Sequence, residues 1–239
     1  QFVARVLDSS AGGLAEMVVR AECSKLQKRF RDLVTISAVM AMLASGGIAL
    51  MNGAFIEIWT SGKVTWAPWN NFLLACVLFT TAVTRCHTSL VGITKQVRGM
   101  KFVYLFEGLA FVTLSVLLVP RIGLTGLLIA ALVCNMAITG TYGVGRTAGY
   151  FGISRLAVTG WIARPAGILL STAGLFLCTR IPALAGLDAS FRLGIGVTLF
   201  CIAVLPALWF FGLDRGLHSE LAGASAKICR NAKSKLGMT

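Results

Sequence analysis

Four polar side chains that lie inside long hydrophobic runs are the residues of this chain best placed to do chemistry. Arg85 and His87 share one run, Glu107 lies in the next run, and Asn135 lies in the run after that. Polar groups are costly in a hydrocarbon environment, so each of the four is a candidate functional group. An arginine can attract an anion, a histidine can carry a proton, and a carboxylate or an amide can line a polar path.

Arg85 and Glu107 are placed to meet. Arg85 lies about 13 Å along the helix from the end of its run at Thr94, which is too deep for the side chain to reach the headgroups easily. Glu107 lies about 8 Å into the next run, and residues 95–101 join the two runs as an antiparallel hairpin. Two interpretations are open and can coexist: a structural ion pair, or a cavity in which Arg85 attracts an anionic group.

The other two side chains also have two interpretations each. His87 is two residues from Arg85 and therefore cannot share its face of a helix. It can carry protons, or it can form a hydrogen bond between helices. Asn135 lies near the middle of its run and can bridge helices or line a path. All four residues are predicted as substrate-binding cavity candidates.

The elements that must position these side chains are membrane-spanning helices. Hydrophobic residues make up 56% of the chain and charged residues 13%, against about 25% charged residues in a soluble domain. The runs of membrane-spanning length are 33–56, 72–94, 102–119, 123–145, 163–181 and 193–213. Each is close to the ~20 residues that cross a bilayer as a helix. The sequence therefore predicts an all-α integral membrane protein built as a six-transmembrane-helix bundle.

The basic residues lie on alternate connections between these runs. The predicted outer segments hold only Lys63, Arg121, Arg180 and Arg192, whereas the inner segments hold nearly all the others. The positive-inside rule then places both ends of the chain in the cytoplasm. A net charge of +13 suits the anionic inner leaflet, so membrane lipids are expected partners and nucleic acid is not.

The same pattern divides the chain into three parts. Residues 1–32 are predicted as a cytoplasmic linker with an amphipathic helix, or alternatively as an extension of the first span. Residues 33–213 form the six-helix transmembrane lobe, and residues 214–239 form a basic cytoplasmic tail. Residues 120–122 predict a tight outer turn, because Pro120 disrupts helix continuity, and Pro206 predicts a kink in the last span.

Three tryptophans mark the first outer loop. Trp59, Trp66 and Trp69 are amphipathic rings that suit the headgroup level and would anchor this end of the bundle. Alternatively, they stack on a sugar. Both interpretations are open.

No catalytic set is visible. The chain lacks a paired-carboxylate site, an H-E-x-x-H motif and a phosphate-binding loop, and its seven cysteines form no C-x-x-C pair. No catalytic residue, metal site or cofactor is predicted, so the chain is expected not to be an enzyme. Transport without a nucleotide site would be driven by an ion gradient, by a substrate gradient or by a partner.

Three segments carry a family resemblance. They are GGLAEMVVRAECSKLQKRFRDL, FIEIWTSGKV and LLACVLFTTAVTRCHTSLVGITKQVRGMKFVYLFEGLAFVTLSVLLVPRIGLTGLLIAALVCN. In this order they resemble the inner linker and seventh helix, the end of that helix, and the eighth-to-tenth-helix core of bacterial polysaccharide (O-antigen type) flippases. These proteins belong to the multidrug/oligosaccharidyl-lipid/polysaccharide exporter superfamily.

The resemblance implies that the chain is one lobe of a transporter with about twelve to fourteen helices, working by alternating access in the bacterial inner membrane. The chain begins with Gln and not Met, which fits a fragment whose N-terminal lobe is missing. The implied substrate is an undecaprenyl-pyrophosphate-linked oligosaccharide for cell-surface polysaccharide, including lipopolysaccharide, and polysaccharide assembly proteins are further expected partners. Within this resemblance, Arg85 would neutralise the pyrophosphate. The alternatives are a drug/cation antiporter of the same superfamily, or a membrane glycosyltransferase, ligase or polymerase subunit of the same pathway.

Overall fold

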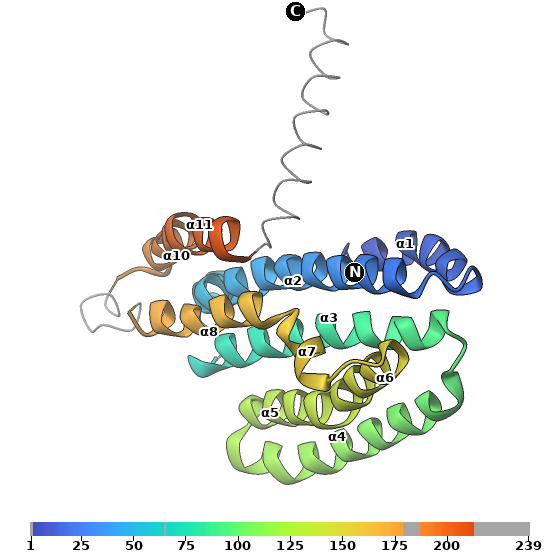
Figure 1. Ribbon diagram of the computed structural model, residues 1–239. Coiled ribbons are helices and arrows are strands. Elements are labelled where there is room, and N and C mark those ends of the chain that lie inside the picture. The colour runs from blue at the N-terminus through green and yellow to red at the C-terminus, as the bar shows by residue number, and fades with distance from the viewer. Residues whose placement is uncertain (1, 65, 179–186, 213–239) are drawn as a thin grey trace, which may run out of the picture.

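The chain is entirely helical over the residues that can be placed. The computed structural model describes residues 2–64, 66–178 and 187–212, and for residues 2–8 and 178 it describes the backbone alone. Every regular element in these ranges is a helix, so the predicted all-α class is confirmed. The helices run roughly side by side as a bundle (Figure 1). In chain order they are α1 (Phe2–Val19), α2 (Cys23–Trp59), α3 (Trp69–Ile93), η1 (Val97–Gly99), α4 (Met100–Ile122), α5 (Leu124–Cys134), η2 (Asn135–Gly140), α6 (Thr141–Phe151), α7 (Arg155–Gly160), α8 (Ala163–Cys178), α10 (Ala189–Leu199), η3 (Phe200–Val204), α11 (Leu205–Ala207) and η4 (Leu208–Gly212).

Five helical segments of the described chain are long and apolar enough to cross a membrane. They are Cys23–Thr60, Trp69–Ile93, Val97–Ile122, Leu124–Phe151 and Ala189–Gly212. They cover five of the six predicted runs, and the chain is therefore a multi-pass membrane protein. The remaining run, 163–181, contains only the shorter apolar helix Ala163–Leu177, and its last residues lie outside the described ranges. The six-span count stays a prediction.

Helix α2 is the centre of the bundle, with α3, α8 and α10 packed around it (Figure 1). Its buried face is made largely of small residues: Ala38, Ala41, Ser45, Gly46 and Ala49. Helices in lipid gain little from burying apolar surface against each other, so association depends on close fit and van der Waals contact. The small side chains of α2 allow this fit on several sides at once.

Helix α10 approaches α2 closely at Gly196. A Cβ atom added at Gly196 would lie 2.9 Å from the backbone oxygen of Leu50 and 3.3 Å from the Cγ of Met51. The first of these atoms belongs to the backbone and cannot move aside alone. Glycine at this position therefore sets the distance between the two helices.

We predict that Gly196→Ala destabilises the bundle by about 1–3 kcal/mol, the usual cost of overpacking. Gly194→Ala is the matched control, because the same added methyl group meets nothing within 4 Å on the same helix. The measurement is the thermal unfolding of both purified variants in detergent micelles. Equal midpoints for the two variants would contradict the close approach.

A second apolar cluster lies where α1 folds back against α2 and α3. Leu14, Leu26, Phe30 and Leu90 are all nearly inaccessible there. Helix α1 ends at Val19, and α2 already starts at Cys23, so the predicted linker is divided between a separate helix and an extension of the first span. The apolar side of α1 therefore packs against α2 and α3.

Helices α4 and α5 form the expected hairpin, but the turn lies later than predicted. Helix α4 runs through Pro120 to Ile122, and the chain reverses at Gly123, whose φ of 60° is in the left-handed region. Pro120 sits in the last turn of α4, where its missing N–H removes only one hydrogen bond, so the expected break at residues 120–122 was wrong. A Cβ atom at Gly126 would lie 2.8 Å from the carbonyl carbon of Leu118, which shows how tightly the hairpin closes.

The last span is irregular around Pro206. The π-helical segments η3 and η4 flank the short helix α11 that contains this proline. A proline inside a helix leaves a carbonyl without its donor, and local π-helical turns are one way to accommodate the mismatch. The interruption lies where the kink was predicted.

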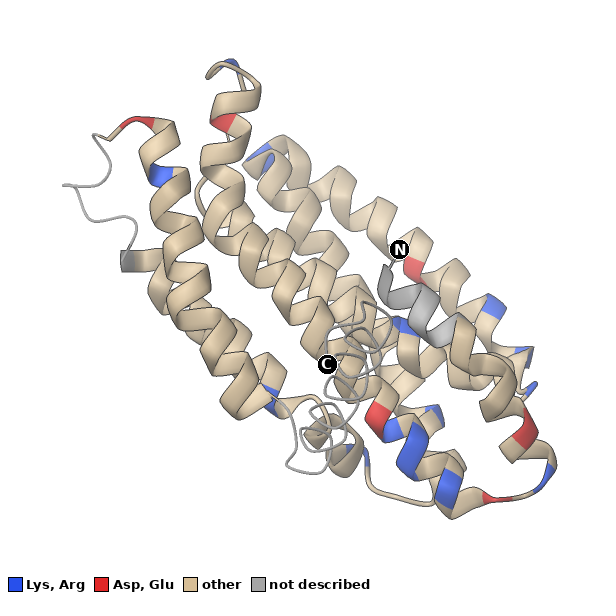
Figure 2. Cartoon of the chain, turned by 90° about the horizontal axis from the view of Figure 1, so that it is seen from above, with Lys and Arg blue, Asp and Glu red and all other residues tan. Residues whose placement is uncertain are grey.

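Charge is distributed unequally between the two ends of the bundle (Figure 2). Most basic residues gather at the end that holds the α3–α4 connection, residues 94–99, and this end is called the basic end below. Few charges lie at the opposite end, where Lys63 and Arg121 are found. There Nη2 of Arg192 on α10 lies 2.6 Å from each carboxylate oxygen of Glu57 on α2.

Candidate functional site

Arg85 lies on the third quarter of α3 with an exposed side chain. No ion pair or hydrogen bond of its guanidinium is formed with any side chain that the structure describes. Its carbonyl oxygen accepts hydrogen bonds from Thr88 Oγ1 at 3.2 Å and from Ser89 Oγ at 2.8 Å. The predicted ion pair with Glu107 is thus not formed within the described residues, and the arginine is left open to whatever lies beside α3.

The exposed side of α3 carries a polar stripe. Thr81, Arg85 and Ser89 are spaced four residues apart and lie on one side of the helix, where all three are exposed or partly exposed. Cys86 and Leu90 lie on other sides and are buried in the bundle. A stripe of this kind is expensive against acyl chains, so it is expected to face water or another protein surface.

Glu107 is the centre of a hydrogen-bonded cluster that joins three spans. Nδ2 of Asn135 donates to Oε1 of Glu107 at 3.2 Å, and the hydroxyl of Thr139 donates to Oε2. The hydroxyl of Thr84 on α3 donates in turn to Oδ1 of Asn135 at 3.2 Å. The structure therefore brings together two of the predicted residues, Glu107 and Asn135, and adds Thr84 and Thr139.

A π-helical segment supplies two members of this cluster. Asn135 and Thr139 belong to η2, in the middle of the span formed by α5, η2 and α6. Single π-helical turns inside α-helices are rare and often occur at functional sites. Gly140 faces α3, since a Cβ atom there would lie in ordinary contact distance, 3.5 Å, of the hydroxyl of Thr84. The bulge thus lets one span present an amide and a hydroxyl to the same carboxylate.

His87 is buried on a different side of α3 from Arg85. Its Nδ1 lies 3.1 Å from Oγ1 of Thr147 on α6, and its ring is flanked by Phe30 at 6.1 Å and Trp161 at 6.5 Å between centroids. Its Nε2 has no partner in the described part of the molecule. A Cβ atom at Gly143 would lie 3.0 Å from that of His87, so α6 packs directly against the histidine. This geometry links two helices and does not bring His87 into the Glu107 cluster.

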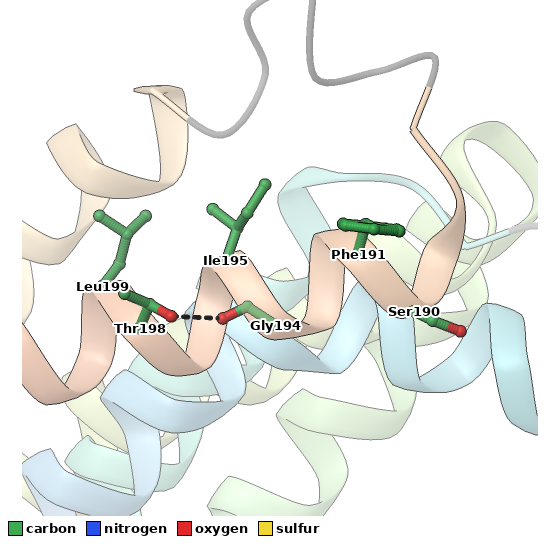
Figure 3. A pocket seen from close by; sticks show the side chains of 6 residues that line it. All are labelled: Ser190, Phe191, Gly194, Ile195, Thr198 and Leu199. Carbon is green, nitrogen blue, oxygen red and sulfur yellow. Dashed lines mark hydrogen bonds between the residues drawn. The ribbon is translucent and has the colours of Figure 1, made fainter.

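A shallow apolar depression of about 480 Å³ lies on α10 (Figure 3). It offers few polar groups to a ligand. The hydroxyl of Thr198 already donates a hydrogen bond to the carbonyl oxygen of Gly194 at 2.9 Å. Its lining contains no titratable side chain and suits lipid chains better than a polar ligand. The residues that line it are Ser190, Phe191, Gly194, Ile195, Thr198 and Leu199.

Sequence reasoning missed Thr84 and Thr139. The spacing of Thr139, four residues after Asn135, was a usable signal, because residues four apart share a helix face. The contact of Thr84 depends on how α3 is rotated against η2, and no local pattern reports that. Among the described residues, no group of three or more His, Cys, Asp or Glu side chains could hold a metal ion.

We predict that Thr139→Val weakens the bundle by about 0.6–1.7 kcal/mol, which are the average and the maximum measured for hydrogen bonds between membrane helices. Thr141→Val is the matched control, because that hydroxyl donates only to carbonyls of its own chain segment, Ala137 and Ile138. Equilibrium unfolding in mixed micelles compares the two. A cycle with Glu107→Gln should show non-additive losses, and strictly additive losses would mean that Glu107 and Thr139 do not interact.

No protein-family model, curated protein or solved structure matches this chain.

Proposed function

We propose that this chain is one lobe of a flippase that translocates an undecaprenyl-pyrophosphate-linked oligosaccharide by alternating access. The observation that carries the proposal is Arg85, an exposed cation inside a membrane span and in the middle of a polar stripe. Intramembrane charges that do not pair within the bundle are typical of substrate pathways. An oligosaccharide pyrophosphate is both anionic and rich in hydroxyl groups, and the stripe offers a matching cation and hydroxyls.

The proposed mechanism assigns separate tasks to the groups of the site. The guanidinium of Arg85 forms charge-assisted hydrogen bonds with the pyrophosphate, while Thr81 and Ser89 contact the first sugar. The polyprenyl chain stays in lipid beside the bundle. A companion lobe covers the stripe from the other side and exposes it alternately to the two faces of the membrane. The basic end of the bundle faces the cytoplasm, on the inner side of the bacterial inner membrane. The pyrophosphate headgroup of the substrate enters the transporter from this side.

A drug/cation antiporter is the second candidate, and the Glu107 cluster favours it. Glu107 is a carboxylate inside a span, with oxygen atoms of Asn135, Thr139 and Thr84 nearby. Such a carboxylate suits a proton or a cation better than a pyrophosphate. Its hydrogen bonds to Asn135 and Thr139 already satisfy it, however, so the open cation at Arg85 carries more weight.

We predict that the full-length gene around this chain restores surface polysaccharide in a flippase-deficient strain. Arg85→Ala should reduce the amount of restored polysaccharide by a factor of about ten or more. The loss of one charge-assisted hydrogen bond, about 1.5–3 kcal/mol, is enough for this effect. Arg85→Lys should retain part of the activity, because the charge remains and only the two-pronged geometry is lost. Surface polysaccharide is scored by gel profile and antibody labelling.

Arg121→Ala is the control, since it removes an exposed arginine from the turn end of α4. Membrane levels and unfolding midpoints are measured for every variant, so that a folding defect is recognised. Full activity of a stable Arg85→Ala protein would contradict the role of Arg85. Failure of a well-expressed parent, together with export of cationic dyes that depends on Glu107, would favour the antiporter.

A further inference from the structure

A pocket of about 560 Å³ with a mixed apolar and polar lining lies at the end of the bundle opposite the basic end. It is open to the surface and lies where the loop after α2 meets the turn between α4 and α5. Its volume falls within the ~300–1,000 Å³ typical of small-molecule sites. The lining residues are Trp66, Ala67, Asn70, Ile122, Gly123, Leu124 and Thr125.

Trp66 is fixed in this pocket by hydrogen bonds. Its indole Nε1 donates to Oδ1 of Asn71 at 2.6 Å, and Nδ2 of Asn52 donates to the same oxygen at 3.0 Å. Asn71 is buried, and its side-chain nitrogen lies against Gly53, where an added Cβ atom would be 2.7 Å away. These hydrogen bonds fix the edge of the indole ring to the protein. A tryptophan that only anchors the helix end in the headgroup layer would not need them.

Asn70 presents a hydrogen-bond donor to the pocket. Its side chain is 2% exposed, and its Oδ1 accepts from the hydroxyl of Thr125 at 2.8 Å. Its Nδ2 has no partner among the residues that the structure describes. An amide nitrogen carries two donors, and this one is not among the fully buried unpaired atoms, so it is accessible at the pocket that Asn70 lines. A ligand with acceptor oxygens would satisfy it.

The chemistry of the lining selects the class of ligand. None of the lining side chains is charged, so neither a phosphate nor an ammonium group would be compensated there. An aromatic ring beside an amide donor and a hydroxyl suits a neutral polyhydroxylated ring, whose apolar face rests on the indole and whose oxygens take the hydrogen bonds. We propose that this pocket binds a neutral sugar ring through Trp66 and Asn70. The identity of that sugar, as part of the translocated oligosaccharide, rests on the proposed function.

The test uses the full-length protein in lipid nanodiscs that contain no glycolipid and no sugar-based detergent. Saturation-transfer NMR is recorded with glucose, galactose, mannose and N-acetylglucosamine, and with glycerophosphoethanolamine as a headgroup probe. Transfer to at least one sugar is expected. Asn70→Asp should weaken that binding about tenfold, because it keeps the acceptor for Thr125 and removes the donor.

Two further variants keep the proposal falsifiable if Asn70→Asp folds poorly. Ala67→Phe fills the pocket from an exposed loop position without touching the hydrogen bonds and should abolish the transfer. Trp59→Phe is the control, because Trp59 is 77% exposed, stacks on Phe55 and lies outside the lining. Transfer to no sugar, transfer only to glycerophosphoethanolamine, or sugar binding that Ala67→Phe leaves unchanged would each overturn the proposal.

The outcome is separable from that of the flippase proposal. Sugar binding that depends on Asn70 in a protein that restores no polysaccharide would keep the pocket and reject the flippase. Restoration that depends on Arg85 in a protein that binds no sugar would keep the flippase and reject the pocket.

Discussion

Hydrocarbon offers membrane helices no gain from hiding apolar surface, and the bundle depends on the close fit that this constraint demands. The small residues of α2 make that fit possible, because they let α3, α8 and α10 approach one helix from several sides. The contact between Gly196 and the backbone oxygen of Leu50 shows the limit, since even a methyl group would not fit there. The positions of the polar groups follow from this packing, because helices held at such short distances can rotate or slide very little.

The polar side chains inside the spans differ in whether they have a partner on another helix. Glu107 and His87 find partners on neighbouring helices, which stabilises the bundle and gives them a structural use. Arg85 finds none in the described part of the chain, although it lies just beside Thr84, a member of the Glu107 cluster. The hydrogen bonds of Glu107 and His87 between helices explain how the helices are held together, and the open guanidinium of Arg85 supports the binding of a ligand. This contrast carries more weight for function than the number of polar groups in the spans.

Much of the helical layout could be predicted from the sequence, because hydrophobic length is a local property. Five of the six runs correspond to helices long and apolar enough to span a membrane. The pairing of side chains across helices could not be predicted, because it depends on rotation: Glu107 bonds to Asn135 and Thr139, whereas Arg85 had been the expected partner. The turn at Gly123 was also displaced, since a proline in a last helical turn costs too little to end the helix. The contact between Asn70 and Thr125 joins segments far apart in sequence, and no local pattern reports it.

The single-residue turn between α4 and α5 has a consequence for how the protein is made. Arg121 is the only charged residue between Glu107 and Arg146, and it lies beside the turn. A hairpin with no polar loop can enter the bilayer as one unit, because its two helices satisfy their own backbone groups and its tip carries one cation across. A longer connection would have to be translocated as a separate polar segment. The tight reversal at Gly123 is therefore compatible with the insertion of the two spans as a single hairpin.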